Sequence, residues 1–294
     1  MISQAVTLEL EEFHFIREFI YRMASIVIEE DKHYLVEYRL TPLIEREGMR
    51  SFRHLVSELR QPSSALLRSQ VVAAMTTNET YFFRDARPFD VLRRVILPQL
   101  IERRRAARSL HLFFGGCSSG QEPCSVAMLL RHDFPELADW NLRLTAIDIS
   151  GEMIRRARAG RYSQFEVNRG LPARMLVKYF QKEGIDWQIS PEIRSMIDFQ
   201  EMNLMQAFEF CFGADLIFLR NVLIYFDQNF RGQLLESIER SQRPDGCLML
   251  GAAETTVFSS EAFLPLPVEH SNMFYLKNTP APFSSNPSLQ QVAL

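Results

Sequence analysis

Short, almost wholly apolar runs alternate with helical stretches from Leu110 onward. The apolar runs cover residues 110–114, 142–147, 197–199, 216–219 and 247–250. Between them, apolar residues recur at helical spacing over 123–131, 151–159, 172–181 and 229–240, each stretch long enough to cross a sheet face. Strands that alternate with helices form a parallel sheet, and strands without a polar face indicate helices on both sides. The pattern therefore predicts an α/β fold with a doubly covered parallel sheet.

The sequence before this alternation is helical throughout. From Leu8 to Met75 apolar residues recur at helical spacing, and Ser51 is a suitable N-cap for the stretch that carries Phe52 and Leu55. We therefore expect a small all-α N-terminal domain over residues 1–75. A linker over 76–90 then leads into the main α/β domain, 91–277.

Two other segments interrupt the main pattern. Between about 161 and 199, glycines and prolines break the helical spacing around a short strand candidate at 187–189, which predicts a small β insertion. Residues 278–294 are rich in Pro, Ser, Asn and Gln, so they are expected to form a disordered tail.

Composition excludes several classes of protein. The formal net charge is -3, and the basic cluster around Arg104 lacks aromatic neighbours for base stacking, so nucleic acid is not expected as a partner. No leader is apparent, and Arg220 and Asn221 interrupt the most apolar segment, so neither export nor membrane insertion is expected. The four cysteines lack paired spacing and the six histidines lack metal-binding spacing. A cytoplasmic protein without a metal site is the simplest interpretation.

A glycine-containing turn, FFGGCSSGQEP, follows the first apolar run and precedes a helical stretch. Gly115, Gly116 and Gly120 would let the backbone approach a nucleotide-like cofactor closely. Glycines at such a position also occur as plain turn residues, and the segment departs from the GxGxxG pattern. The two interpretations are about equally supported.

Polar residues stand where the other apolar runs end. Asp148 ends the second run, where it would accept hydrogen bonds from ribose hydroxyls or cap the next helix, although Ser150 would also serve as that cap. Asn203 and Leu204 follow the third run, and Arg220 and Asn221 follow the fourth. A buried Arg-Asn pair needs partners, which indicates either a functional site or a structural salt bridge beneath a loop.

Several segments together resemble one family. TTNETYFFRD, GGCSSGQEPCS, TAIDIS, FLRNVLIYFD and GAAETTVF occur in the order found in CheR-type chemotaxis receptor methyltransferases, and the helical domain and GRYSQFEVNRGLP are also similar. The resemblance implies a Rossmann-like class I fold that uses S-adenosyl-L-methionine. It further implies methyl transfer to glutamate side chains of receptors, which gives glutamate 5-O-methyl esters and S-adenosyl-L-homocysteine in chemotactic adaptation.

The resemblance also assigns residues. The cofactor would be held by linker residues, by Glu122, by Asp148 at the ribose and by the polar residues after the later strands. These are Asn78, Thr80, Arg84, Glu122, Asp148, Asn203, Leu204, Arg220 and Asn221. Arg84 and Tyr225 would line the reacting centre.

A basic helix face is the candidate for receptor docking. Arg53 and Arg60 lie seven residues apart, opposite an apolar face, with Arg46 and Arg50 just before them. By the resemblance, the partner is the cytoplasmic helical domain of methyl-accepting chemotaxis receptors, with recruitment to receptor arrays at the inner membrane. From the residues alone, a solvated face of an ordinary amphipathic helix is the simpler interpretation.

Two other functions share the cofactor residues. One is a class I methyltransferase acting on another protein or a small molecule, and the other is a non-catalytic module that binds S-adenosyl-L-methionine as a signal. The sequence does not specify the receptor, the modified glutamates, the regulators or the oligomeric state. It also leaves open whether the insertion binds a receptor C-terminal peptide.

Overall fold

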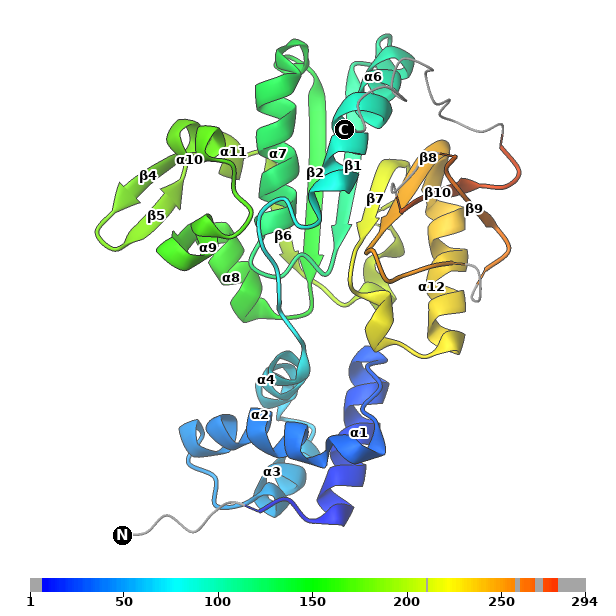
Figure 1. Cartoon of the computed structure of the whole chain (residues 1–294). Helices are drawn as coiled ribbons and strands as arrows, with labels where there is room; N and C mark the ends of the chain where they lie inside the picture. Colours follow the sequence, from blue (N-terminus) through cyan, green and yellow to red (C-terminus); the bar gives the residue numbers. More distant parts are fainter. Residues whose placement is uncertain (1–6, 210, 257–259, 268–271, 280–294) are drawn as a thin grey trace.

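The computed structural model describes residues 7–209, 211–256, 260–267 and 272–279. Residues 280–294 of the expected disordered tail lie outside this part of the chain. The N-terminal helices are α1 (Leu10–Ala24), η1 (Glu30–Lys32), α2 (His33–Arg46), α3 (Phe52–Leu59) and α4 (Ala65–Met75). They form a separate body below the sheet (Figure 1).

The helical domain has a hydrophobic core of its own. Phe13 and Ile16 from α1 are buried with Leu40 from α2 and Leu55 from α3. The predicted cap is confirmed, since the Ser51 hydroxyl accepts a hydrogen bond from the His54 N–H and satisfies a donor that the first turn of α3 leaves unpaired.

The chain then enters the main domain through α5 (Ala86–Val91), the π-helical turn η2 (Leu92–Ile96) and α6 (Leu97–Arg104). The strands of the main sheet are β1 (Ser109–Gly115), β2 (Asn141–Asp148), β6 (Ile197–Glu201), β7 (Ala214–Leu219), β8 (Gln242–Leu250), β9 (Phe263–Pro265) and β10 (Met273–Leu276), in the order β6-β2-β1-β7-β8-β10-β9. All five predicted strands are confirmed, and they pair in parallel. Two short antiparallel strands, β10 and β9, extend the edge at β8 and were not predicted.

Helices cover both faces of the sheet, as the apolar strands predicted. Leu112 and Phe114 of β1 point into a core shared with α6 and α7 (Gln121–Asp133). Phe113 points to the opposite face, where it joins Leu234 and Ile238 of α12 (Gln228–Ser241). Because successive strand residues point to opposite faces, a strand buried on both sides needs apolar residues at every position.

A second sheet forms the insertion. Its elements are β3 (Arg161–Ser163), α9 (Gln164–Asn168), α10 (Ala173–Tyr179), β4 (Phe180–Glu183), β5 (Asp186–Ile189) and α11 (Pro191–Arg194). The three strands are antiparallel, in the order β3-β5-β4, and they lie beside α8 (Gly151–Ala159), to the side of the main sheet (Figure 1).

One helix prediction is wrong in this region. Residues 172–181 were expected to form a helix across the main sheet, but α10 ends at Tyr179 and belongs to the insertion. At Phe180 the backbone becomes extended, and its ring packs edge-on against Phe82 and Tyr162, with centroids 5.6 and 6.2 Å away. Burial of this aromatic ring favours the strand over continuation of the helix.

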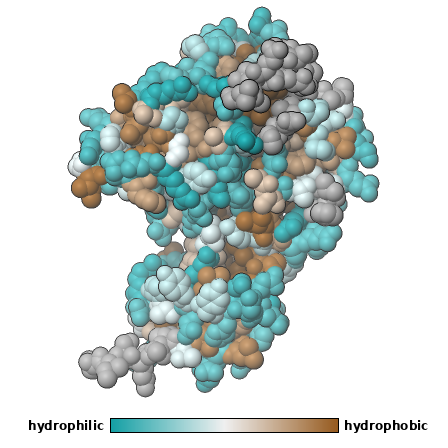
Figure 2. All heavy atoms as spheres, viewed as in Figure 1, coloured by the Kyte–Doolittle hydropathy of each residue, from teal (hydrophilic) through white to brown (hydrophobic). Residues whose placement is uncertain are grey.

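The end of α1 is tied to the main domain. Ile26 forms an antiparallel bridge with Phe226, and the Val27 N–H donates to the Tyr225 carbonyl at 2.9 Å. The Tyr21 hydroxyl donates to the Asp227 carboxylate at 2.6 Å. Figure 2 shows the narrow waist where the two bodies meet. These contacts bring the helical domain close to the carboxyl end of β7.

Candidate functional site

A cavity of about 230 Å³ lies at the carboxyl ends of β1, β2, β6 and β7. The segment after α1 and the linker after α4 complete its wall. All ten predicted cofactor and catalytic residues line it, namely Asn78, Thr80, Arg84, Glu122, Asp148, Asn203, Leu204, Arg220, Asn221 and Tyr225. Strand ends at a change of strand order are where ligands bind in open α/β sheets.

The glycines of the β1–α7 turn are needed by the protein's own packing. Gly116 has φ +70°, and a Cβ there would lie 2.6 Å from the Val222 side chain. A Cβ on Gly115 would lie 2.8 Å from the Leu204 side chain. The turn interpretation is therefore supported directly, while Gly116 also lines the cavity.

Asp148 does not cap a helix. The Ser150 hydroxyl caps α8 by accepting from the Met153 N–H. The Asp148 carboxylate accepts from the Ser118 and Ser150 N–H groups, both at 2.8 Å, one on each oxygen. Burial raises the pKa of this carboxyl, and the two N–H groups oppose the rise. Each oxygen keeps a free lone pair, which suits a pair of hydroxyl donors.

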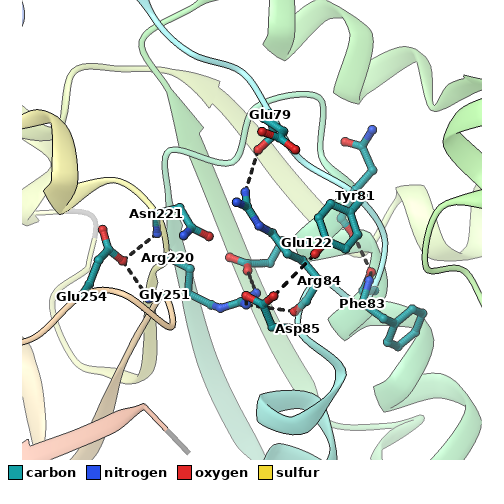
Figure 3. Close-up of polar contacts among 12 residues, drawn as sticks. Glu79, Tyr81, Phe83, Arg84, Asp85, Glu122, Arg220, Asn221, Gly251 and Glu254 are labelled. Carbon is teal, nitrogen blue, oxygen red and sulfur yellow. Dashed lines mark hydrogen bonds and ion pairs between the residues drawn. The ribbon is translucent and has the colours of Figure 1, made fainter.

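Arg220 is held in a buried ion cluster (Figure 3). Its guanidinium donates to Glu122 at 2.5 Å, to Asp85 at 3.0 Å and to the Arg84 carbonyl at 2.9 Å. The Arg220 side chain is only 1% exposed. Burial raises the pKa of the Glu122 carboxyl, and the positive charge of Arg220 opposes the rise. The salt-bridge interpretation thus holds for Arg220, and that salt bridge forms part of the cavity wall.

Asn221 has one unusual backbone angle and one unsatisfied atom. Its φ is +60°, a left-handed value that Asn tolerates better than most residues. Its carboxamide oxygen is buried and has no hydrogen-bond partner among the residues that the structure describes. An unpaired buried acceptor that lines a cavity indicates a donor on the ligand.

The linker side of the cavity carries Arg84. Its guanidinium donates to the Glu79 carbonyl at 2.8 Å and lies 5.5 Å from the centre of the Tyr81 ring. Nearby, the Asn78 carbonyl accepts from the Ser118 hydroxyl at 3.0 Å, which fixes the linker to the β1–α7 turn. Thr80 and the half-buried Tyr225 complete the rim.

Asn203 connects the cavity to the helical domain. Its side-chain amide donates to the Met23 carbonyl at 2.7 Å, and its oxygen accepts from the Met205 N–H at 3.0 Å. Asn203 therefore also fixes one wall of the cavity. The four arginines proposed for docking do not line this cavity, although Arg46 lines a neighbouring groove between α2 and α8.

Two buried or half-buried acids at the site were missed from the sequence. Asp85 binds Arg220. Glu254, 7% exposed, accepts from three backbone N–H groups, those of Asn221 and Ile224 in the segment after β7 and that of Gly251 after β8. The available signal for Glu254 was an acid four residues after the last apolar run, in GAAETTVF. Ala24 and Ile26 were also missed as wall residues, because nothing in their sequence places them beside the sheet.

Comparison with known families decides the identity. Residues 78–270 match a family described as CheR methyltransferase, SAM binding domain, and residues 11–76 match CheR methyltransferase, all-alpha domain. The chain belongs to the CheR methyltransferase family. The resemblance noted in the sequence is thereby confirmed, and so is the class I methyltransferase fold.

Curated relatives of this CheR chain agree with the assignment. It is 37% identical to chemotaxis protein methyltransferase Cher2 from Pseudomonas putida, over 84% of this chain and 90% of that protein. It is 38% identical to chemotaxis protein methyltransferase 1 from Pseudomonas aeruginosa, over 83% and 89%. A chemotaxis protein methyltransferase from Vibrio parahaemolyticus is 33% identical, over 88% and 94%. Likeness to proteins of this name over 83–88% of the chain, together with the match to a SAM binding domain, makes the chain a methyltransferase dependent on S-adenosyl-L-methionine.

The cavity of this CheR chain fits that cofactor. Asp148 offers two acceptor oxygens for the ribose diol, and the Asn221 carboxamide oxygen offers an unpaired acceptor. Glu122 adds negative charge near a ligand that carries an amino group and a sulfonium. No helix in the described ranges is long and apolar enough to cross a membrane. Within the same ranges, no group of three or more His, Cys, Asp or Glu side chains is arranged to hold a metal ion.

Proposed function

We propose that this CheR-family chain esterifies glutamate side chains on the cytoplasmic helical domain of chemotaxis receptors. The products would be glutamate 5-O-methyl esters and S-adenosyl-L-homocysteine. The observation that carries the proposal is the convergence of ten residues on one cavity. They come from the linker, the first turn of α7, the end of β2 and the segments after β6 and β7. Relatives named chemotaxis protein methyltransferase supply the receptor class. The chain would act in the cytoplasm, at receptor arrays.

The cofactor would be held by residues already positioned for it. When bound, S-adenosyl-L-methionine supplies a methyl group on a positively charged sulfonium. Asp148 would accept from the ribose hydroxyls, and the Asn221 carboxamide oxygen would accept from a donor of the ligand. Glu122, neutralised in part by Arg220, would provide electrostatic complementarity without leaving an uncompensated buried charge.

Catalysis by this chain would consist mainly of alignment. A glutamate of ordinary pKa is ionised near neutral pH, so no base is required to create the nucleophile. Arg84 would orient the acceptor carboxylate, and Tyr225 would donate a hydrogen bond close to it. Correct placement of two reactants contributes roughly 7–11 kcal/mol in favourable cases. Arg84 must place the carboxylate without stabilising its ground state more than the transition state.

Replacement of Arg84 by Ala tests this assignment. We expect turnover on receptors to fall about 100-fold, because the acceptor carboxylate loses its orienting group. Single-turnover methylation and calorimetric titration with S-adenosyl-L-homocysteine would separate chemistry from binding. The matched control is Arg87→Ala, which removes an exposed arginine on α5 that does not line the cavity. Full turnover together with unchanged cofactor affinity in Arg84→Ala would remove Arg84 from the reacting centre.

The exposed arginines around α3 are the proposed docking surface. Arg53 lies 3.7 Å from Glu12, and the Arg60 guanidinium lies 4.9 Å from the centre of the Phe15 ring. Arg46 pairs with Glu47 at 3.1 Å, and Arg50 is exposed. The Arg53 and Arg46 side chains remain 85% and 59% exposed within these pairs, so their guanidinium groups are accessible to an acidic receptor helix.

Charge reversal tests the docking surface. Arg53→Glu combined with Arg60→Glu should slow receptor methylation about 10-fold or more at low salt, because like charges then face the partner. Affinity for S-adenosyl-L-homocysteine should not change. The matched control reverses two exposed arginines of the main domain, Arg94→Glu in η2 with Arg105→Glu at the end of α6. Equal methylation rates for the two double variants would exclude this docking surface.

The chemical identity of the product distinguishes the proposal from its alternatives. Receptor fragments incubated with the chain and S-adenosyl-L-methionine would be digested and sequenced by mass spectrometry. A methyl group on glutamate that mild base removes supports the proposal. A methyl group on another residue type, or on small molecules only, would favour a different class I methyltransferase. Cofactor binding without any product would favour a regulatory module.

A further inference from the structure

Glu254 joins the ends of two neighbouring strands beside the cavity. It follows β8 in sequence, is 7% exposed and does not line the cavity itself. One carboxylate oxygen accepts from both the Gly251 N–H and the Asn221 N–H at 2.7 Å, and the other faces the Ile224 N–H at 3.3 Å. Figure 3 shows the carboxylate between the Asn221 loop and Gly251. A single side chain therefore satisfies donors from two separate segments.

The segments that contain Gly251 and Asn221 approach so closely that no side chain larger than that of glycine fits between them. A Cβ on Gly251 would lie 2.7 Å from the side-chain Nδ2 of Asn221 and 2.8 Å from its backbone nitrogen. Asn221 has φ +60°, so its backbone conformation is one that needs support from its surroundings. On the opposite side, the Asn272 side chain donates to the Gly251 carbonyl. Hydrogen bonds thus fix both the N–H and the carbonyl of Gly251. Because Glu254 also accepts from the Asn221 N–H, it fixes Asn221 relative to Gly251.

The residues that Glu254 holds are pocket residues. Asn221 carries the unpaired carboxamide oxygen, and Arg220 next to it carries the buried ion cluster. Ile224, at the second carboxylate oxygen, lines the cavity and immediately precedes Tyr225. The direction in which Asn221 and Tyr225 face the ligand therefore depends on a carboxylate outside the ligand's reach.

We propose that Glu254 is a positioning residue of the cofactor pocket. Its carboxylate accepts from the Asn221 and Ile224 N–H groups and so fixes the loop from Arg220 to Tyr225 against Gly251, whose N–H it also accepts. The role rests on the proposed function, since it requires S-adenosyl-L-methionine to occupy this cavity. It predicts a specific order among variants. Glu254→Ala removes every acceptor, Glu254→Asp retains the charge but shortens the reach, and Glu254→Gln keeps an oxygen for the two shorter hydrogen bonds.

The test is calorimetric titration of the full chain with S-adenosyl-L-homocysteine, together with thermal unfolding of the ligand-free chain. We expect Glu254→Ala to weaken binding about 10- to 100-fold, because buried donors lose their acceptor and the loop shifts. Glu254→Asp should weaken it about 10-fold, and Glu254→Gln by about 3-fold or less. The matched control is Asp245→Ala, which removes a carboxylate of β8. Asp245 pairs with Arg104 and does not line the cavity.

The outcomes separate positioning from general stabilisation. Positioning predicts that Asp245→Ala lowers the unfolding temperature while its affinity equals that of the unchanged chain. A Glu254→Ala chain that binds within about 2-fold of the unchanged chain would overturn the proposal. If Glu254→Ala does not fold, the same affinity in folded Glu254→Asp would overturn it. If the unchanged chain does not bind at all, the proposed function fails, and this role fails with it.

Discussion

Replacement of Arg220 by Met is expected to destabilise the chain by about 3–5 kcal/mol, the usual cost when one partner of a buried ion pair is removed. The Glu122 carboxylate, 15% exposed, would lose its 2.5 Å partner, and the Arg84 carbonyl would lose a donor. Urea unfolding of the ligand-free chain measures the effect. Because this cluster forms a cavity wall, affinity for S-adenosyl-L-homocysteine should fall as well.

A double variant provides the control for Arg220. Glu122→Gln combined with Arg220→Met removes the uncompensated charge, so the pair should be less destabilised than the sum of the two single variants. Unfolding free energies that simply add would show that the two side chains do not interact. An Arg220→Met chain as stable as the unchanged one would contradict the buried ion cluster.

Replacement of Arg104 by Met should cost about 3 kcal/mol or more at the opposite end of the sheet. Arg104 donates to Asp215 at 2.7 Å and binds Asp245 through two hydrogen bonds of 2.6 and 2.9 Å. Asp215 is 1% exposed and would keep only the half-exposed Arg243, 3.3 Å away, as a cationic partner among the described residues. Cofactor affinity should not change, because Arg104 does not line the cavity.

An exposed ion pair gives the comparison for Arg104. Arg105→Met removes a neighbouring arginine whose partner, Glu102, lies 2.6 Å away with both side chains mostly exposed. Exposed pairs contribute between about 0 and 1 kcal/mol, so its unfolding free energy should stay close to that of the unchanged chain. Equal losses for the two variants would show that burial of Arg104 is not the source of its effect.

The main elements were predictable because their signals are local. Each central strand is buried on both faces, so it appears in the sequence as an unbroken apolar run, as at 110–114 and 216–219. The strands β9 and β10 are three and four residues long. β10 pairs with the distant strand β8, and β9 pairs with β10 to form the edge of the sheet. Short edge strands carry too few residues for a pattern to emerge. The prediction of a helix over 172–181 was wrong for a similar reason, because Phe180 packs against aromatic rings that are distant in sequence.

The residues that line the cavity could be predicted from the sequence, but the hydrogen bonds and ion pairs between them could not. Asp148, Arg220 and Asn221 stand where apolar runs end, and parallel strands bring such ends to one edge. The sequence left open whether Arg220 was functional or a salt bridge, because its partners, Asp85 and Glu122, are 135 and 98 residues away. The role of Glu254 is equally hard to predict from the sequence pattern, because its three N–H donors come together only when β7 and β8 pair.

The most direct measurement of the central claim is transfer of radiolabelled methyl from S-adenosyl-L-methionine to membranes that contain chemoreceptors. Mild base would then release the label as methanol if the bond is an ester. The predicted result is label on the receptors that base releases, incorporated about 100-fold more slowly with Arg84→Ala. Tight binding of the cofactor without label on any receptor would contradict the claim.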